Sequence, residues 1–254
     1  MADHEPWDAQ TLQAVWFSPR AREVDAARIY MAMTGREPDT VQTNKAPQAA
    51  NPFLGVAQGA LEHADAVVQV QQTRVDFFLN ASSREAVVLP LISDTERHID
   101  DFVTNFQNAA DAVPDVIRCA LVLNCLKPAP SLEEAASLVG WAIGSPIDLR
   151  HATDLGFSAN IQKIFANGDF RMNRVLRWSA DTYQMLNVQV GMPSMAVAPT
   201  ATTLEQFAAT HYIDINMAPV RSPVDPKILA ELIGEMGAEA KRVRAMQTLK
   251  ALEN

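Results

Sequence analysis

Alternation of apolar and polar side chains marks several strands with one buried face in this chain. The clearest case is residues 67–79, which mix β-branched residues with polar ones. Its second half sets three apolar side chains against three polar ones: Val75, Phe77 and Leu79 on one face, Arg74, Asp76 and Asn80 on the other. Antiparallel sheets tolerate a wet face and parallel sheets rarely do, so the pattern favours an antiparallel sheet.

Further strands are expected at residues 10–18, 87–92, 116–126 and 211–217. The segment 116–126 is apolar on nearly both faces, which predicts a central strand because both of its faces would be covered.

A hairpin is expected around Asn167-Gly168, which lies between segments 157–166 and 169–190. This dipeptide is typical of a tight turn in which both residues adopt positive φ, so the two segments should pair antiparallel. Residues 175–190 exceed the usual strand length and predict a bend or break near residues 180–182.

Helical spacing of apolar side chains predicts helices over residues 20–34, 93–112, 131–143 and 225–252. Gly35 is placed to end the first helix, and Ser131 is placed to cap the third. Pro226 suits the first position of the last helix, in which Gly234 and Gly237 each cost about 1 kcal/mol relative to Ala. Residues 36–52, rich in Pro, Gln and Asn, are expected to form a loop.

These elements predict one α+β domain over residues 1–254, with a mainly antiparallel sheet covered by helices and a long C-terminal helix. Their order suggests two pseudo-duplicated halves, 10–92 and 93–223, followed by the helix 225–252. No residue-level repeat supports the duplication, so it is a prediction about topology alone.

Composition narrows the classes of partner. The chain has 254 residues and a formal net charge of −9, so its long-range field repels phosphate backbones and anionic lipid headgroups. No apolar run has the length of a membrane-spanning helix, and residues 1–5 lead into no signal-peptide core. Cys119 and Cys125 lie too far apart in one strand to form a disulfide. We therefore expect a cytoplasmic protein that contacts neither nucleic acid nor membrane.

No common catalytic motif for nucleotide, zinc or serine-hydrolase chemistry occurs in the sequence. The histidines include no pair spaced to make a helical metal site. Asp214 and Asn216, in one strand, supply fewer oxygens than calcium requires. We therefore predict no catalytic residue, no metal and no cofactor. Whether the chain is an enzyme stays open at this point, and the sequence favours a noncatalytic protein.

Two groups of residues are candidates for binding a ligand. Arg74, with Asp76, and Arg118 can project onto one sheet face and form a polar floor, although cross-strand ion pairing explains the same residues. Arg150 and His151 form the densest local cluster of acid–base groups and lie in a predicted loop, for which a polar turn is the alternative.

The C-terminal helix is the candidate surface for a protein partner. Its predicted length of roughly 40 Å can outrun the domain. The residues expected to contact a partner or a second copy are Met236, Arg242, Val243, Arg244 and Met246. A solvated helix end is the alternative interpretation of the basic residues near position 242.

Three segments resemble a sporadically distributed, uncharacterised family of bacterial proteins of about this length. They are the Q-V-Q strand of residues 68–74, the strand pair around Asn167-Gly168, and the strand 212–215 with the charged helix after it. The resemblance covers about half of the chain and departs from the family between Ala81 and Ser158. It implies no active site.

The leading hypothesis is therefore a noncatalytic interaction or assembly module that works through a protein partner or self-association. The alternative is an enzyme or small-ligand binder with a polar pocket over the exposed sheet face. Convergence of Arg74, Arg118, Arg150 and His151 in a concave pocket would favour the alternative. A flat apolar patch between Met236 and Met246 would favour the module.

Overall fold

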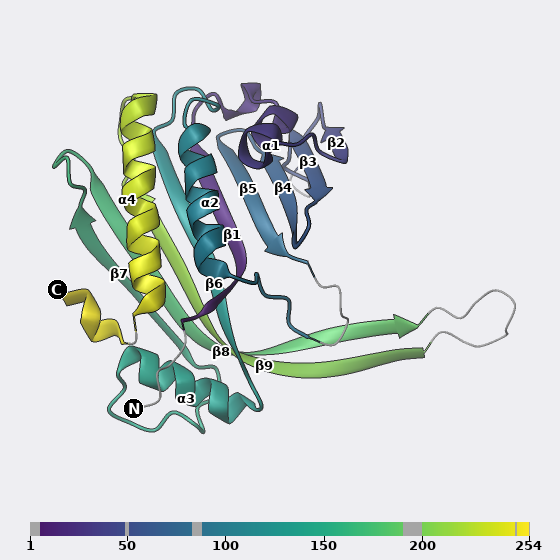
Figure 1. Ribbon diagram of the computed structural model, residues 1–254, viewed down its shortest axis with the longest axis vertical. Coiled ribbons are helices and arrows are strands. Elements are labelled where there is room, and N and C mark those ends of the chain that lie inside the picture. Colours follow the sequence, from purple (N-terminus) through teal and green to yellow (C-terminus); the bar gives the residue numbers. More distant parts are fainter. Residues whose placement is uncertain (1–5, 49–50, 83–87, 190–199, 247, 254) are drawn as a thin grey trace, which may run out of the picture.

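The computed structural model describes residues 6–48, 51–82, 88–189, 200–246 and 248–253. One antiparallel sheet of nine strands, in the order β2-β3-β4-β5-β1-β6-β9-β8-β7, spans this part of the chain (Figure 1). The expected α+β class, with a mainly antiparallel sheet and a C-terminal helix, is confirmed.

The strands are β1 (Asp8–Phe17), β2 (Thr40–Thr43), β3 (Gly55–Ala60), β4 (Ala64–Val70), β5 (Arg74–Ala81), β6 (Arg118–Ala129), β7 (Gly156–Ile164), β8 (Arg171–Gln189) and β9 (Thr200–Met217). The helices are α1 (Ala26–Thr34), α2 (Thr95–Asn108), α3 (Leu132–Ile143) and α4 (Pro226–Ala245), with short 3-10 helices η1 (Ala21–Glu23) and η2 (Leu249–Glu253).

The sheet is centred on β1 and β6, which pair antiparallel with Leu12 opposite Leu123. Strand β5 flanks β1 on one side, and β9 flanks β6 on the other. Four strands lie on the β1 side of this pair and three on the β6 side, and the helices of the two sides take different positions. The order alone does not establish a duplication.

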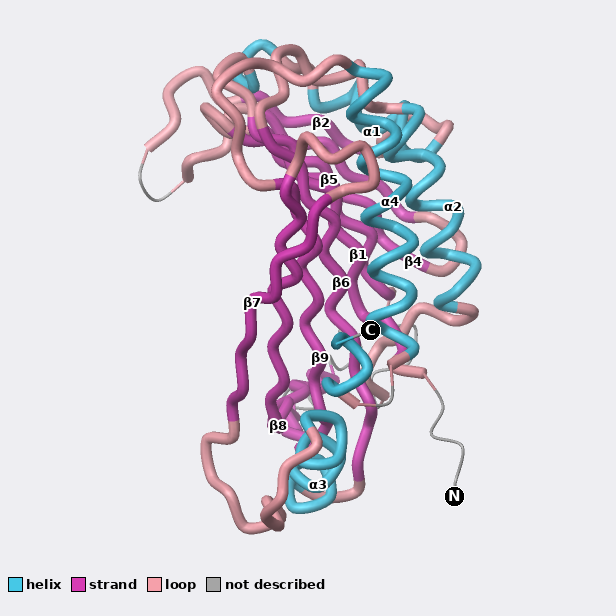
Figure 2. The backbone as a smooth tube through the Cα atoms, turned by 90° about the vertical axis from the view of Figure 1, so that its left-hand side faces the viewer, coloured by secondary structure: helices cyan, strands magenta, loops and turns pink. Residues whose placement is uncertain are grey.

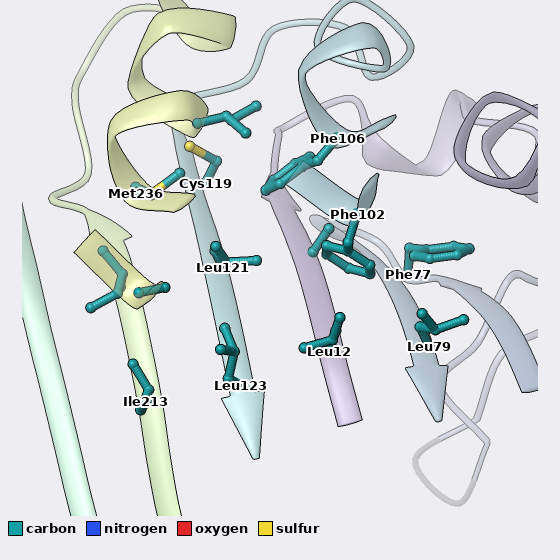
Figure 3. Close-up of a cluster of buried hydrophobic side chains, with 14 of the residues drawn as sticks. Leu12, Phe77, Leu79, Phe102, Phe106, Cys119, Leu121, Leu123, Ile213 and Met236 are labelled. Carbon is teal, nitrogen blue, oxygen red and sulfur yellow. The ribbon is translucent and has the colours of Figure 1, made fainter. Parts of the chain in front are cut away.

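Helices α1, α2 and α4 lie along one face of the sheet, and the opposite face carries none of them (Figure 2). The buried core fills the space beneath α2 and α4, where Phe102 and Phe106 meet Phe77 and Leu12, and Met236 lies beside Cys119 (Figure 3). This arrangement follows from the alternation, because only one face of most strands is apolar.

Two local signals read from the sequence act as expected. Gly35 ends α1 with φ 69°, and the Ser131 hydroxyl accepts a hydrogen bond from the Glu134 backbone N–H. Residues 67–79 form two strands, β4 and β5, joined by a turn at residues 71–73. The loop expected at 36–52 is wrong in part, because it contains the short edge strand β2.

The short strand expected at 87–92 is wrong for residues 88–92, while Val87 lies outside the described residues. Pro90 lacks the N–H that a ladder needs. The side chain of Leu89 is buried against Leu126 and Ala208 of the sheet, so its apolar character serves packing.

The hairpin after β7 is present, but its turn differs from the expectation. Gly168 has φ 79°, whereas Asn167 does not adopt positive φ. The turn is wider than two residues, because Phe165 and Phe170 close it through a backbone hydrogen bond of 3.0 Å.

Strand β8 continues without the expected break, because β9 pairs with it along its whole length to Gln189. The pairing of β8 with β7 ends at Ser179, and that of β9 with β6 ends at Phe207. Beyond these points residues 182–189 and 200–206 form a two-stranded projection, called the arm below (Figure 1).

Helices α2 and α4 pack closely because α4 presents glycines to α2. A Cβ atom added at Gly237 would lie 2.7 Å from both Cγ atoms of Val103. At Gly234 the nearest atom would be Nε2 of Gln107, also at 2.7 Å. These glycines weaken the isolated helix but permit the contact between the two helices.

We predict that Gly237→Ala destabilises the protein although Ala favours a helix. Overpacking costs typically ~1–3 kcal/mol and exceeds the gain in helix propensity of ~1 kcal/mol here, because both Cγ atoms of the stiff, β-branched Val103 lie in the way. Val103→Ala removes the opposing methyl groups, so the double variant should be more stable than the sum of the single effects implies. Urea unfolding of the four proteins measures this coupling.

Gly234→Ala is the matched control, because it meets the flexible end of Gln107. Its gain in helix propensity of ~1 kcal/mol should be offset by loss of the hydrogen bond that Gln107 donates to the Ala230 carbonyl oxygen at 3.0 Å, so its free energy of unfolding should stay close to that of the parent protein. Strict additivity of Gly237→Ala and Val103→Ala would contradict the proposed packing constraint.

Candidate functional site

The sheet face opposite α1, α2 and α4 carries a cluster of arginines stacked on aromatic rings. Phe17 of β1 lies between β5 and β6, opposite Arg74 in one strand and Arg118 in the other. The guanidinium carbon of Arg74 lies 5.3 Å from the centre of the Phe17 ring, and that of Arg118 lies 4.8 Å from it. The structure thus brings together two of the arginines that the sequence singled out.

The two arginines differ in their partners. Arg74 donates to both carboxylate oxygens of Asp76, at 2.8 and 2.9 Å from its Nε, and Gln13 donates to the same carboxylate at 2.7 Å. Asp76 is 1 % exposed, so this ion pair within one strand neutralises Arg74. Arg118 makes no hydrogen bond or ion pair with the described residues, and its buried Nε has no partner among them.

A second stacked arginine lies further along the same face. Arg177 of β8 pairs in register with Tyr212 of β9, and its guanidinium lies 5.3 Å from the Tyr212 ring. The Arg177 side chain makes no ion pair or hydrogen bond with the described residues, although its charge acts on Asp214. Its side chain is exposed to solvent.

Asp214 occupies the middle of this face. It accepts a hydrogen bond of 2.9 Å from Asn216, which in turn accepts one of 2.9 Å from Asn173. Burial raises the pKa of Asp214, while the hydrogen bond from Asn216 and the charges of Arg118 and Arg177 oppose the rise. We call Phe17, Arg118, Arg177, Tyr212 and Asp214, with the Arg74–Asp76 pair, the arginine face.

The arginine face stands on an apolar floor that is closed to solvent. Val15, Ala120 and Val122 are only 2, 4 and 6 % exposed, because Phe17 and Tyr212 pack around them. Pockets of about 340 to 400 Å³ occur elsewhere, for example beside Asp39 and beside Trp141, and none of these includes an arginine of the face. The arginine face is therefore a surface that presents guanidinium groups, and the pockets named above lie away from it.

Arg150 and His151 do not join this cluster. Both are exposed in the loop after α3, at the opposite end of the sheet from the strand ends that carry Arg74 and Arg118 (Figure 2). Arg150 donates to Asp148 at 2.6 Å, and these hydrogen bonds hold the pKa of Asp148 at about 2. The convergence of four residues that a ligand pocket required is therefore not present.

The residues expected to contact a partner on the last helix lie mostly inside the molecule. Met236 and Val243 are fully buried, Met246 is half-buried, and Arg244 donates to the Trp7 carbonyl oxygen at 2.8 Å. Arg242 donates to Glu239. This placement corrects the expectation of an exposed patch, because α4 lies along the sheet and turns its apolar side towards the core.

Arg177, Phe17 and Tyr212 were not singled out from the sequence. Alternation in β8 places Arg177 on a face, but its contact with Tyr212 depends on the register of β8 and β9. Likewise, Phe17 meets two arginines only because β1 lies between β5 and β6. These contacts could be predicted from the sequence only if the order of neighbouring strands were known.

Groups with strongly shifted pKa values lie away from the arginine face. Burial raises the pKa of both Cys119 and Cys125 to about 12. Burial also acts to raise the pKa of Glu239, but hydrogen bonds from Arg242 and Arg174 outweigh it and hold the pKa at about 2. The two thiols are buried in the core and Glu239 is ion-paired with Arg174 and Arg242, so these three groups do not form an acid–base site.

Within the described ranges, no three His, Cys, Asp or Glu side chains are placed to hold a metal ion. No helix in the same ranges combines the length and the apolar character needed to cross a membrane. Comparison of the chain with family models, with curated proteins and with solved structures finds no match.

His211 is buried between two tryptophans on the helix-covered side of the sheet. Its ring stacks on Trp178 with centroids 4.4 Å apart and meets the edge of Trp7 at 5.5 Å. Neither ring nitrogen has a hydrogen-bond partner among the described residues. Burial therefore lowers the pKa of His211 to about 3.

We predict that His211 makes the protein sensitive to acid. In the unfolded chain the ring takes up a proton below about pH 6.5, whereas in the folded protein it stays neutral down to about pH 3. Stability from this group is therefore complete above pH 6.5 and is lost as pH falls, by about 1.4 kcal/mol per pH unit.

Urea unfolding at pH 7 and pH 5 measures this effect. The loss of stability between the two pH values should be about 2 kcal/mol smaller in His211→Phe than in the parent protein. His63→Phe, at an exposed position, is the control for loss of a histidine. An equal loss in His211→Phe and the parent would contradict the assignment.

Proposed function

We propose that this chain is a noncatalytic interaction protein whose arginine face binds an acidic segment of a partner protein. The observation that carries the proposal is the pair Arg118 and Arg177, each stacked on an aromatic ring and neither bound to a carboxylate of the described residues. Stacking positions a guanidinium without using its N–H groups, so the terminal NH2 groups of both arginines stay available for a carboxylate, while Nε of Arg118 is buried.

Charge on the face supports an acidic partner although the whole chain is acidic. At physiological ionic strength screening limits exposed charges to a range of about 8 Å. On the face itself Asp76 is neutralised by Arg74, and the other carboxylate, Asp214, accepts a hydrogen bond from Asn216. The arginine face therefore carries three arginines, Arg74, Arg118 and Arg177, against two carboxylates, which leaves it one positive charge in excess.

The shape of the face favours a polypeptide over a small ligand. Its floor is sealed by Phe17 and Tyr212, so a small molecule would find no apolar cavity to enter. Arg118 and Arg177 lie on strands separated by β9 and are offset along the sheet. An extended segment with spaced Asp or Glu side chains can reach both.

The test is the binding of a fluorescently labelled, extended peptide rich in Asp and Glu to the whole chain. Fluorescence anisotropy measures the dissociation constant. Arg118→Glu and Arg177→Glu should each weaken binding roughly tenfold or more, since a charged hydrogen bond contributes ~1.5–3 kcal/mol. Arg177 is exposed, so its variant keeps the test valid if Arg118→Glu fails to fold.

Arg28→Glu provides a matched control, because Arg28 is exposed on α1 at the other side of the sheet. It makes the same change in net charge and should leave binding unchanged. Equal weakening by all three variants would indicate non-specific charge attraction and contradict the proposal. Tighter binding of a single-stranded oligonucleotide than of the peptide would contradict it too.

A further inference from the structure

The arm presents unpaired sheet edges. Among the described residues, strand β8 beyond Ser179 pairs with β9 on one side and with no strand on the other, and residues 200–206 of β9 pair with β8 alone. An isolated two-stranded ribbon is only marginally stable in water. At its base Tyr183 packs near Leu89 and Leu91.

The arm lacks the features that usually protect a sheet edge. Residues 182–189, Thr-Tyr-Gln-Met-Leu-Asn-Val-Gln, contain no charge, no Pro and no Gly. Residues 200–206 contain one charge, Glu205. Natural edges are usually short, charged or broken by Pro, because a long neutral edge pairs with other strands.

The other edges of the same sheet are protected in these ways. Strand β2 has four residues, and β7 carries Lys163, which bonds to Glu239 of α4 at 3.4 Å. Residues 182–189 differ from both edges, because they outnumber the residues of β2 and, unlike β7, carry no charge.

We propose that the β8 edge of the arm, residues 182–189, pairs antiparallel with the same edge of a second copy of this chain. The product is a four-stranded ribbon in the order β9-β8-β8-β9 across a two-fold axis. The β8 edge is preferred over the β9 edge because residues 182–189 carry no charge, whereas Glu205 lies on β9.

A second copy is the partner that the arm fits most simply. A strand paired antiparallel with its own copy is related to it by a two-fold axis, so one surface serves both chains and the assembly closes as a dimer. A strand of about eight residues is also longer than the typical strand of five to six, so the shared ladder is substantial. Backbone groups supply this pairing, and the neutral side chains add no repulsion.

The test is the mass of the whole chain by sedimentation equilibrium over a series of protein concentrations. The chain should move from 27.8 kDa towards twice that mass as concentration rises. The double variant Thr182→Lys and Gln184→Lys, at exposed positions of the arm, should weaken the dimer at least roughly tenfold, because it puts cations along the shared edge.

The matched control is Thr40→Lys with Gln42→Lys, which makes the same two changes at exposed positions of the edge strand β2. It should dimerise like the parent chain. Hydrogen exchange of the amides of residues 182–189 should slow as the dimer forms.

A monomeric mass at every concentration would overturn the proposal, and so would equal dimerisation of the arm variant and the control. Dimerisation without slower exchange in residues 182–189 would place the contact elsewhere and overturn it too. The arm variant keeps the arginine face intact, so its binding of the acidic peptide should be unchanged.

Discussion

Burial of one face of the sheet against α2 and α4 is the interaction on which the rest of the structure depends. Phe106 of α2 meets Trp16 edge to face at 4.7 Å, and Phe102 contacts Phe77 at 5.7 Å. These contacts join the helix layer to β1 and β5. Helix α4 continues the layer over β6 and β9, and the glycines at its contact with α2 let both helices share the same face.

On the sheet face that α1, α2 and α4 leave uncovered, apolar side chains must be shielded from water in another way. Here the apolar floor of Val15, Ala120 and Val122 is shielded by aromatic rings and long side chains. The guanidinium groups of Arg118 and Arg177 stand above the rings of Phe17 and Tyr212; Arg177 is exposed, whereas Arg118 is half-buried. The same arrangement that protects the floor therefore leaves charged donors at the surface.

The sequence carries enough information for the class of fold and for individual elements. Alternation at Val75, Phe77 and Leu79, the cap at Ser131 and the apolar segment of β6 all depend on residues close in the chain. The arginine face depends on neighbours far apart in sequence, since Phe17 joins Arg74 and Arg118 through strand order. For the same reason the outward or inward direction of α4 could not be read from its own pattern, because Met236 and Val243 suit a partner surface as well as a core.

The position of β1 in the middle of the sheet has a consequence for how the chain acquires its structure. The partner of β1 on one edge, β5, emerges early in synthesis. The partner on the other edge, β6, begins roughly a hundred residues after the end of β1. Until then the growing polypeptide holds an incomplete layer with a free central edge. Closing such distant ladders is slow, so nascent chains of this protein spend longer in a state that chaperones recognise.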